Sequence, residues 1–121
     1  MNVKKSMATN AKCVTKIKIY ITDMQTILTT YEISSSDKLR NALAAKYAIT
    51  QLITNIYELS RQLQATTLDK LPQFNSPVLR KTRQIASHDY EAVDFRSIYN
   101  LCTQLINPVV QDELERCLLP K

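Results

Sequence analysis

The sequence predicts an all-α fold, arranged as an antiparallel four-helix bundle. Two observations carry this prediction: the 121 residues include no glycine, and apolar residues recur at spacings of three and four in several segments. Hairpin turns and phosphate-cradling loops depend on residues that tolerate positive φ, chiefly glycine. A P-loop or a dinucleotide-binding turn is therefore excluded, whereas helices joined by short polar loops need no glycine.

The first two helices are expected over residues 11–31 and 38–64, separated by the helix-capping cluster at 34–37. The apolar residues of the first share one face: Val14, Ile17, Ile21, Met24, Leu28 and Tyr31. The stripe of the second comprises Leu39, Leu43, Leu52, Ile56, Leu59 and Leu63, with Ala44, Ala45 and Ala48 allowing close approach.

The third and fourth helices are expected over residues 77–87 and from Asp94 to about residue 118. Ser76 before Pro77 marks a helix start, because proline lacks only an N–H that would be unpaired there. Pro108 should kink or break the fourth helix. Four amphipathic segments with short links pack as an antiparallel bundle. Residues 1–121 thus form a single domain, with residues 1–10 a flexible basic N-terminus.

The net charge of +5 is concentrated at the N-terminal end, where five lysines precede the first acidic residue, Asp23: Lys4, Lys5, Lys12, Lys16 and Lys18. A basic end attracts phosphate backbones, although a solvated terminus gives the same pattern. No apolar run approaches the roughly 18 residues of a membrane span, and no signal peptide is evident. We therefore expect a cytoplasmic protein with no membrane contact.

The three cysteines, Cys13, Cys102 and Cys117, are odd in number and lack a C-x-x-C spacing. With one histidine in the chain they make a poor zinc set. Reduced thiols of a cytosolic protein are the simplest interpretation, and no metal or other cofactor is expected.

The candidate chemistry lies around the single histidine, His88, which follows Arg83 by five positions and precedes Tyr90 by two. A lone histidine at a helix end is often a capping or surface residue. Here Arg80 and Lys81 add positive charge in the preceding turn. Arginine presents donors suited to a phosphate, and histidine exchanges a proton near neutral pH. Together they supply what metal-free RNA cleavage requires.

Arg83 and His88 cannot converge on a straight helix, because residues five apart point about 140° away from each other. They can meet if the helix ends between them or if two chains come together. Acid–base chemistry also works better with two histidines, and a two-fold dimer would bring the same patch together twice. The sequence thus indicates a composite site.

Arg83-x-x-x-x-His88-x-Tyr90 resembles the signature of the HEPN superfamily, specifically its HepT-like branch. The similarity covers roughly residues 11–118 and extends to further segments: 47–49 and 55–59 in the second helix, 91–94 after the tyrosine, Tyr99, and 107–108. The chain departs from the family pattern at Gln84, where Asn or Asp is frequent, and at Tyr57, which replaces a glycine.

This resemblance implies a HEPN-like bundle that acts as a metal-independent endoribonuclease on tRNA or mRNA. It implies a homodimer with a composite active site, and a toxin role opposite a minimal nucleotidyltransferase antitoxin. By resemblance, Arg83 and His88 are catalytic, and Tyr90 positions RNA and accepts AMP. Supporting positions are Gln84, Glu58, Arg80 and Lys81.

Two other interpretations stay open at the level of the sequence. The chain could be a noncatalytic helical subunit that binds a nucleotide or a nucleotidyltransferase partner through the same residues. It could also be an unrelated four-helix interaction protein. Glu58 in mid-helix is equally typical of a solvated or ion-paired carboxylate, and Tyr99 of a packing residue.

Overall fold

The computed structural model describes residues 7–75, 79–81 and 94–118. Within these ranges all regular structure is helical and no strand occurs, so the all-α prediction is confirmed for the described part of the chain. The elements are α1 (Met7–Thr30), α2 (Ser36–Asn41), α3 (Leu43–Ser60), α4 (Ala65–Asp69), the 3₁₀ helix η1 (Pro72–Asn75), α6 (Phe95–Leu105) and α7 (Pro108–Arg116). Residues 79–81 are helical as well.

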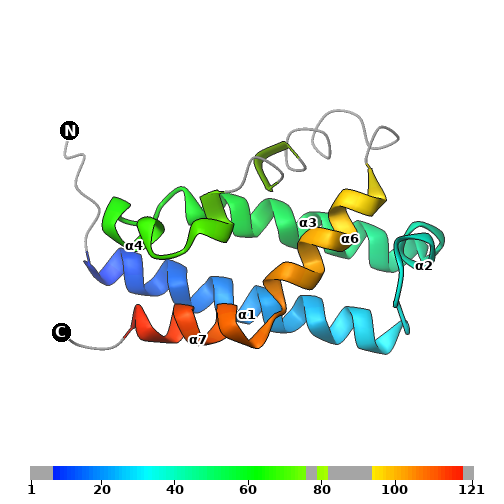
Figure 1. Cartoon of the computed structure of the whole chain (residues 1–121), viewed down its shortest axis with the longest axis horizontal. Coiled ribbons are helices and arrows are strands. Elements are labelled where there is room, and N and C mark those ends of the chain that lie inside the picture. The colour runs from blue at the N-terminus through cyan, green and yellow to red at the C-terminus, as the bar shows by residue number, and fades with distance from the viewer. Residues whose placement is uncertain (1–6, 76–78, 82–93, 119–121) are drawn as a thin grey trace.

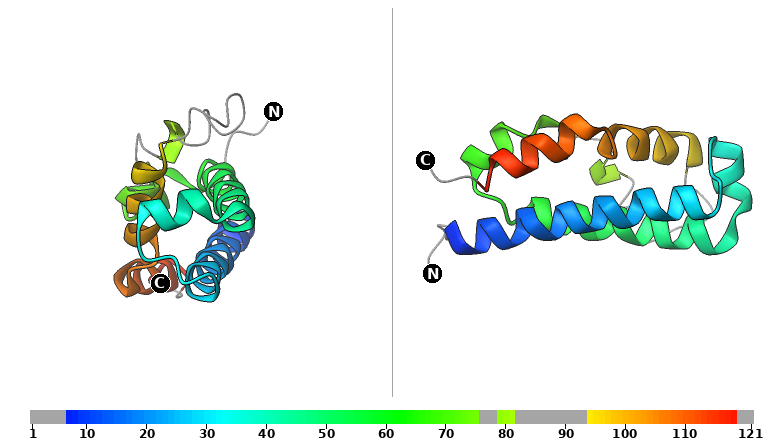
Figure 2. Two further views of the ribbon diagram at one scale, coloured as in Figure 1. Left: turned by 90° about the vertical axis from the view of Figure 1, so that its right-hand side faces the viewer. Right: turned by 90° about the horizontal axis from the view of Figure 1, so that it is seen from below.

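The long helices α1 and α3 run antiparallel and pack side by side (Figure 1). Helices α6 and α7 follow one another along this pair and form a second layer (Figure 2). The short helix α2 closes one end and packs on α6, while α4 lies at the other end, beside the start of α1. No helix in these described ranges has both the length and the apolar character to cross a membrane.

The core-facing side of α1 follows the predicted stripe. Four of its residues have no exposed surface and Leu28 is 7% exposed; the four are Val14, Ile17, Ile21 and Met24. Tyr31 is the exception, with 51% exposure, because the helix ends at Thr30 and the chain turns away there. The helix starts at Met7, four residues before the expected boundary.

Helix α1 ends in a C-terminal cap that is formed without glycine. The N–H of Ile33 donates to the carbonyl of Leu28 at 2.8 Å, and the N–H of Glu32 donates to that of Thr29 at 3.1 Å. These are the two hydrogen bonds of a Schellman cap, in which one residue adopts the left-handed conformation usually taken by glycine. Glu32, with φ of 53°, takes that position.

The expected helix over residues 38–64 is interrupted, which corrects that prediction. Ser35 caps α2 by accepting from the N–H of Lys38 at 3.2 Å. Ala42 then adopts φ −99° and ψ 88°, outside the helical region, and α3 starts afresh at Leu43. The break shifts the helical phase, so Leu39 is fully buried whereas Leu43 is 63% exposed.

The predicted stripe is confirmed in part: Ile56 in α3 and Leu63 just after it are buried, with 0% and 2% exposure. The core residues of α3 are Ala45, Ile49, Ile53 and Ile56, each without exposed surface. Leu52 and Leu59 are half-buried at the edge of this face. Ala45 is fully buried, as expected of an alanine that allows close approach, whereas Ala44 is exposed.

The predicted start and interruption of the last helical segment are confirmed. Asp94 caps α6 by accepting from the N–H of Arg96 at 3.0 Å. The chain breaks before Pro108, and Asn107 caps α7 by accepting from the N–H of Val109 at 3.0 Å. Proline at the first position of α7 leaves no donor unpaired. The buried side of the two helices comprises Phe95, Ile98, Leu101, Cys102, Leu105, Val110 and Leu114.

Candidate functional site

Most of the sequence-predicted site lies outside the described residues. Arg83, Gln84, His88 and Tyr90 all belong to residues 82–93. Three supporting positions, Glu58, Arg80 and Lys81, are described, and all three are exposed. Arg80 and Lys81 come together as neighbours in one helical segment, whereas Glu58 lies on a separate element, α3. The described parts of the site are therefore its flanks.

The flank before the candidate segment is fixed by Leu79. This side chain has no exposed surface and belongs to the main hydrophobic core. The two residues that follow it in the same helical turn, Arg80 and Lys81, are exposed. Burial of a leucine contributes about 2–3 kcal/mol, so the core holds this turn in place while two cationic side chains face solvent.

The flank after the candidate segment is fixed by Asp94 and Phe95. The hydroxyl of Ser97 donates to Asp94 Oδ2 at 2.9 Å, and Phe95 packs into the core with 9% exposure. The Ser97 hydrogen bond is the main cause that lowers the pKa of the Asp94 carboxyl below its usual 3.8, with further help from the Arg96 N–H. Asp94 is thus charged at neutral pH and caps α6 as a carboxylate.

Lys46 links α3 to this second flank, a contact that the sequence analysis missed. Its ammonium lies 5.8 Å from the centre of the Phe95 ring and 5.9 Å from that of Tyr47, within the range of a cation–π interaction. Lys46 and Phe95 are 49 positions apart, so helical periodicity gives no signal for the pair. A positive charge therefore lies where α6 begins.

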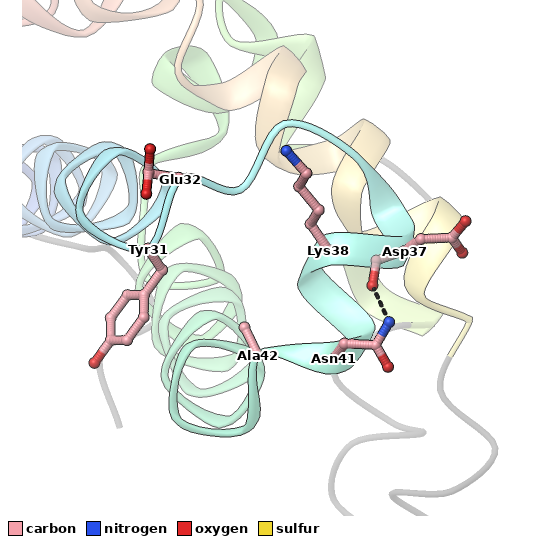
Figure 3. Close-up of a pocket in the computed structure, with 6 residues that line it drawn as sticks. All are labelled: Tyr31, Glu32, Asp37, Lys38, Asn41 and Ala42. Atoms are coloured by element: carbon pink, nitrogen blue, oxygen red, sulfur yellow. Dashed lines mark hydrogen bonds between the residues drawn. The ribbon is translucent and has the colours of Figure 1, made fainter.

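Among the open hollows lined by described residues, we consider two, and neither contains a sequence-predicted site residue. The larger, of about 440 Å³, lies where α1, α2 and the link to α3 meet. Its lining is Tyr31, Glu32, Asp37, Lys38, Asn41 and Ala42 (Figure 3). The second, of about 300 Å³, lies between α1 and the residues after α7: Thr15, Lys18, Ile19, Thr22, Asp23 and Leu118 line it.

The larger hollow offers little for catalysis. Tyr31 and Glu32 point in opposite directions from the end of α1 (Figure 3). The side-chain amide of Asn41 donates a hydrogen bond to the backbone carbonyl of Asp37 in α2 at 3.0 Å, so this N–H is already paired within the protein. No histidine or cysteine lines the hollow, so it lacks the side chains that most often exchange protons or attack substrates near neutral pH.

The described cysteines act as packing residues. Cys102 has no exposed surface, and burial raises the pKa of its thiol to about 12. Burial is also the main cause that raises the pKa of the Cys117 thiol. A protonated thiol is a poor metal ligand and nucleophile. Among the described residues, no group of three or more His, Cys, Asp or Glu side chains is placed to hold a metal ion.

No protein-family model, no curated protein and no solved structure matches this chain. Its function is therefore inferred from its own residues and from their arrangement.

Proposed function

We propose that this chain is a metal-independent endoribonuclease, the toxin of a HEPN/nucleotidyltransferase toxin–antitoxin pair. The observation that carries the proposal is the spacing of Arg83, His88 and Tyr90, followed at Asp94 by the start of a helix. The all-helical fold of the described residues agrees with the proposed HEPN-like antiparallel four-helix bundle, in which α1, α3, a helix that includes residues 79–81, and α6 with α7 would be the four units.

In the proposed reaction, His88 removes the proton from a ribose 2′-hydroxyl, and the 2′-oxygen attacks the adjacent phosphorus. The bond from phosphorus to the 5′-oxygen breaks, leaving a 2′,3′-cyclic phosphate, and the leaving oxygen takes up a proton. Arg83 neutralises the charge that develops on the phosphorane. Atoms and charge balance without a metal ion or a cofactor.

The proposal includes a homodimer, because one chain supplies one histidine and the reaction has two proton transfers. A two-fold axis near the site would bring His88 of one copy opposite His88 of the second. It would also let Arg83 of one copy meet His88 of the other, which the five-residue spacing disfavours along a straight helix. The active site would thus be composite.

The described flanks support this placement of the site. Leu79 and Phe95, the core residues on either side, are 0% and 9% exposed, so the candidate segment starts and ends on the packed bundle. Arg80 and Lys81 project into solvent immediately before it. Exposed cations next to a phosphodiester-cleaving segment attract the RNA backbone, and Gln84 and Glu58 would support the site by hydrogen bonding.

Regulation in this proposal acts through Tyr90. A minimal nucleotidyltransferase would transfer AMP from ATP to the phenol oxygen and release pyrophosphate. The added phosphate would bring negative charge and bulk two residues from His88, where RNA must approach. Both the substrate and the reduced state of the cysteines fit a cytoplasmic location.

The experiment is cleavage of total RNA and tRNA in EDTA by the purified protein and by His88→Ala and Arg83→Gln variants. We expect cleavage by the parent and a loss of at least 100-fold in both variants, the typical scale of acid–base and electrostatic contributions. Lys38→Gln, an exposed change on α2, is the matched control and should cleave normally.

The alternative is a noncatalytic subunit that binds a nucleotide or a nucleotidyltransferase. No cleavage by a parent protein whose mass shows an unmodified Tyr90 would favour this alternative. Equal cleavage by the parent and His88→Ala proteins would instead point to a contaminating nuclease and remove the basis of the proposal.

A further inference from the structure

We propose that the outer face of α1 binds the phosphate backbone of single-stranded RNA. We define this face by Lys12, Thr15, Lys16 and Ile19. The inference rests on the proposed function, since it concerns how the same substrate is held, but it uses described residues alone. It adds a binding surface that lies outside the Arg83–His88–Tyr90 segment.

The register of α1 places the two lysines together in solvent. The fully buried Val14, Ile17 and Ile21 define the side that faces the core. Lys12 and Lys16 are four residues apart, so they lie one helical turn and about 6 Å apart on the opposite side, and both are exposed. Neither forms an ion pair with any acid in the described part of the chain.

The surroundings separate this pair from most other exposed cations. Six of the described exposed cations have an acidic residue within four sequence positions: Lys38, Arg40, Arg61, Lys70, Arg96 and Arg116. Two described exposed pairs have none, namely Lys12 with Lys16 and Arg80 with Lys81. Unscreened like charges on a helix repel one another, and a bound polyanion relieves that repulsion.

The other charged residues of α1, Lys18 and Asp23, do not extend this positive surface. Lys18 forms an ion pair with Glu115 of α7, so its charge is already balanced. Asp23 is the one acidic residue between Met7 and Thr30, and it is exposed. It follows Lys16 by seven residues, or about 10 Å along the helix axis. The first half of the outer face therefore carries two net positive charges.

A partly apolar hollow that includes Thr15 and Ile19 of the outer face favours a single strand over a duplex. Ile19 is 53% exposed, and with Leu118 it supplies apolar walls to the hollow of about 300 Å³ on this side of α1, whose polar lining includes Thr15 of the outer face and, at its far end, Asp23. An unpaired base can turn toward an apolar wall while its phosphates stay near the lysines, whereas a duplex keeps its bases stacked and paired.

The test uses the full chain carrying His88→Ala, so that binding is measured without cleavage. Fluorescence anisotropy of a labelled 16-nucleotide RNA is recorded from 50 to 200 mM salt. Each phosphate contact on a single strand contributes about 0.7 to the slope of log affinity against log salt. We expect Lys12→Gln with Lys16→Gln to flatten the slope by about 1.4, and Asp23→Asn to strengthen binding.

The matched control is Lys38→Gln with Lys70→Gln, which removes the same charge from two exposed positions outside the outer face of α1. The inference predicts a smaller effect for this control. Equal effects of the two double variants overturn it, because the attraction would then follow net charge alone. Tighter binding to a duplex of the same length overturns the choice of a single strand. Binding to vesicles of anionic lipid with no binding to RNA overturns the ligand class.

Failure of this inference can be separated from failure of the proposed function. If the parent cleaves RNA through His88 while the α1 double variant binds like the control, the nuclease proposal stands and the α1 site is wrong. If the parent does not cleave but the α1 double variant loses RNA affinity selectively, the binding face stands and the nuclease proposal is wrong.

Discussion

The side chain of Asn10, near the start of α1, is joined to Thr67 in α4, 57 residues further along the chain. Its amide donates to the Thr67 hydroxyl at 3.0 Å, and its carbonyl oxygen accepts from the N–H of Gln64 at 2.7 Å. Asn10 is 6% exposed and Thr67 is 8% exposed. A buried polar pair of this kind fixes the position of α4, a helix of five residues that is too short to be stable by itself.

We expect Asn10→Ala to lower the free energy of unfolding by about 1–3 kcal/mol, because it leaves buried polar groups of α4 without partners. Urea denaturation measures this loss. Gln25→Ala, on the exposed side of the same helix, is the control and should change stability by less than about 0.5 kcal/mol. Equal effects of the two changes would show that Asn10 does not hold α4.

Glu32 is expected to be a point of stored backbone strain. For a residue with a Cβ, the left-handed conformation costs roughly 1–2 kcal/mol of steric strain. Glycine has no such strain, but it loses roughly 0.5–1 kcal/mol more backbone entropy on folding. Glu32→Gly should therefore raise the free energy of unfolding, by about 0.5–1 kcal/mol. Thr29→Gly, inside α1, should instead lower it by roughly 0.3 kcal/mol, the difference between the helix propensities of threonine and glycine. A loss of stability in Glu32→Gly would contradict the cap.

Leu39 and Leu43 should respond very differently to truncation, because the break at Ala42 places one in the core and the other in solvent. We expect Leu39→Ala to cost about 2–5 kcal/mol and Leu43→Ala to cost less than about 0.5 kcal/mol. Thermal or urea unfolding of both variants provides the measurement. Similar losses would mean that residues 38–64 form the continuous helix expected from the sequence.

The Asp94 cap should make stability depend on acid pH. Its pKa in the folded protein is lowered, so the unfolded chain binds a proton first as the pH falls. The contribution of the cap is complete above the usual value of 3.8 and decreases as the pH falls through the folded value. Asp94→Asn keeps an acceptor for the Arg96 N–H but does not titrate. The difference in stability between parent and variant should therefore shrink below pH 3.8, and a difference that grows there would contradict the prediction.

The flank before the candidate segment allows packing and binding to be tested separately. Leu79→Ala should destabilise the protein by about 2–5 kcal/mol, since the side chain is fully buried. Arg80→Gln with Lys81→Gln should leave stability within about 0.5 kcal/mol and weaken RNA binding by a salt-dependent amount. Calorimetry and RNA binding on the same three proteins make the comparison. A destabilised double variant would show that the cations are structural.

Much of the fold followed from the sequence because local rules determine it. The α1 stripe from Val14 to Leu28 and the caps at Ser35 and Asp94 depend on spacing or on a single residue type. The interruption at Ala42 was missed, since alanine is a strong helix former and no proline or glycine marks the position. The packing of α2 against α6 determines where the helix is interrupted. The residues of α6 lie far from Ala42 in the sequence, so local patterns do not indicate the interruption.

The candidate site could be predicted as a set of residues, but its long-range neighbours could not. The spacing of Arg83, His88 and Tyr90 is visible in one stretch of sequence. The approach of Lys46 to Phe95 depends on how α3 meets α6, and a helical pattern carries no such information. The outer face of α1 is an intermediate case. The sequence shows its lysines as a cluster. Only the fold shows that Lys18 pairs with Glu115, and that Lys18 therefore differs from Lys12 and Lys16.

The pairing of α1 with α7 also constrains when the bundle can be completed during synthesis. Lys18 and Glu115 are 97 residues apart, and Gln111 donates to the Lys18 carbonyl at 3.3 Å. The antiparallel α1–α3 hairpin can assemble once Ser60 has left the ribosome. The side of this hairpin that α7 covers stays open until Arg116 has emerged, several seconds later at roughly 5–20 residues per second. Val14, Ile17 and Ile21 share the described core with Val110 and Leu114 of α7, so the nascent hairpin exposes apolar surface during that interval and depends on α7 to cover it.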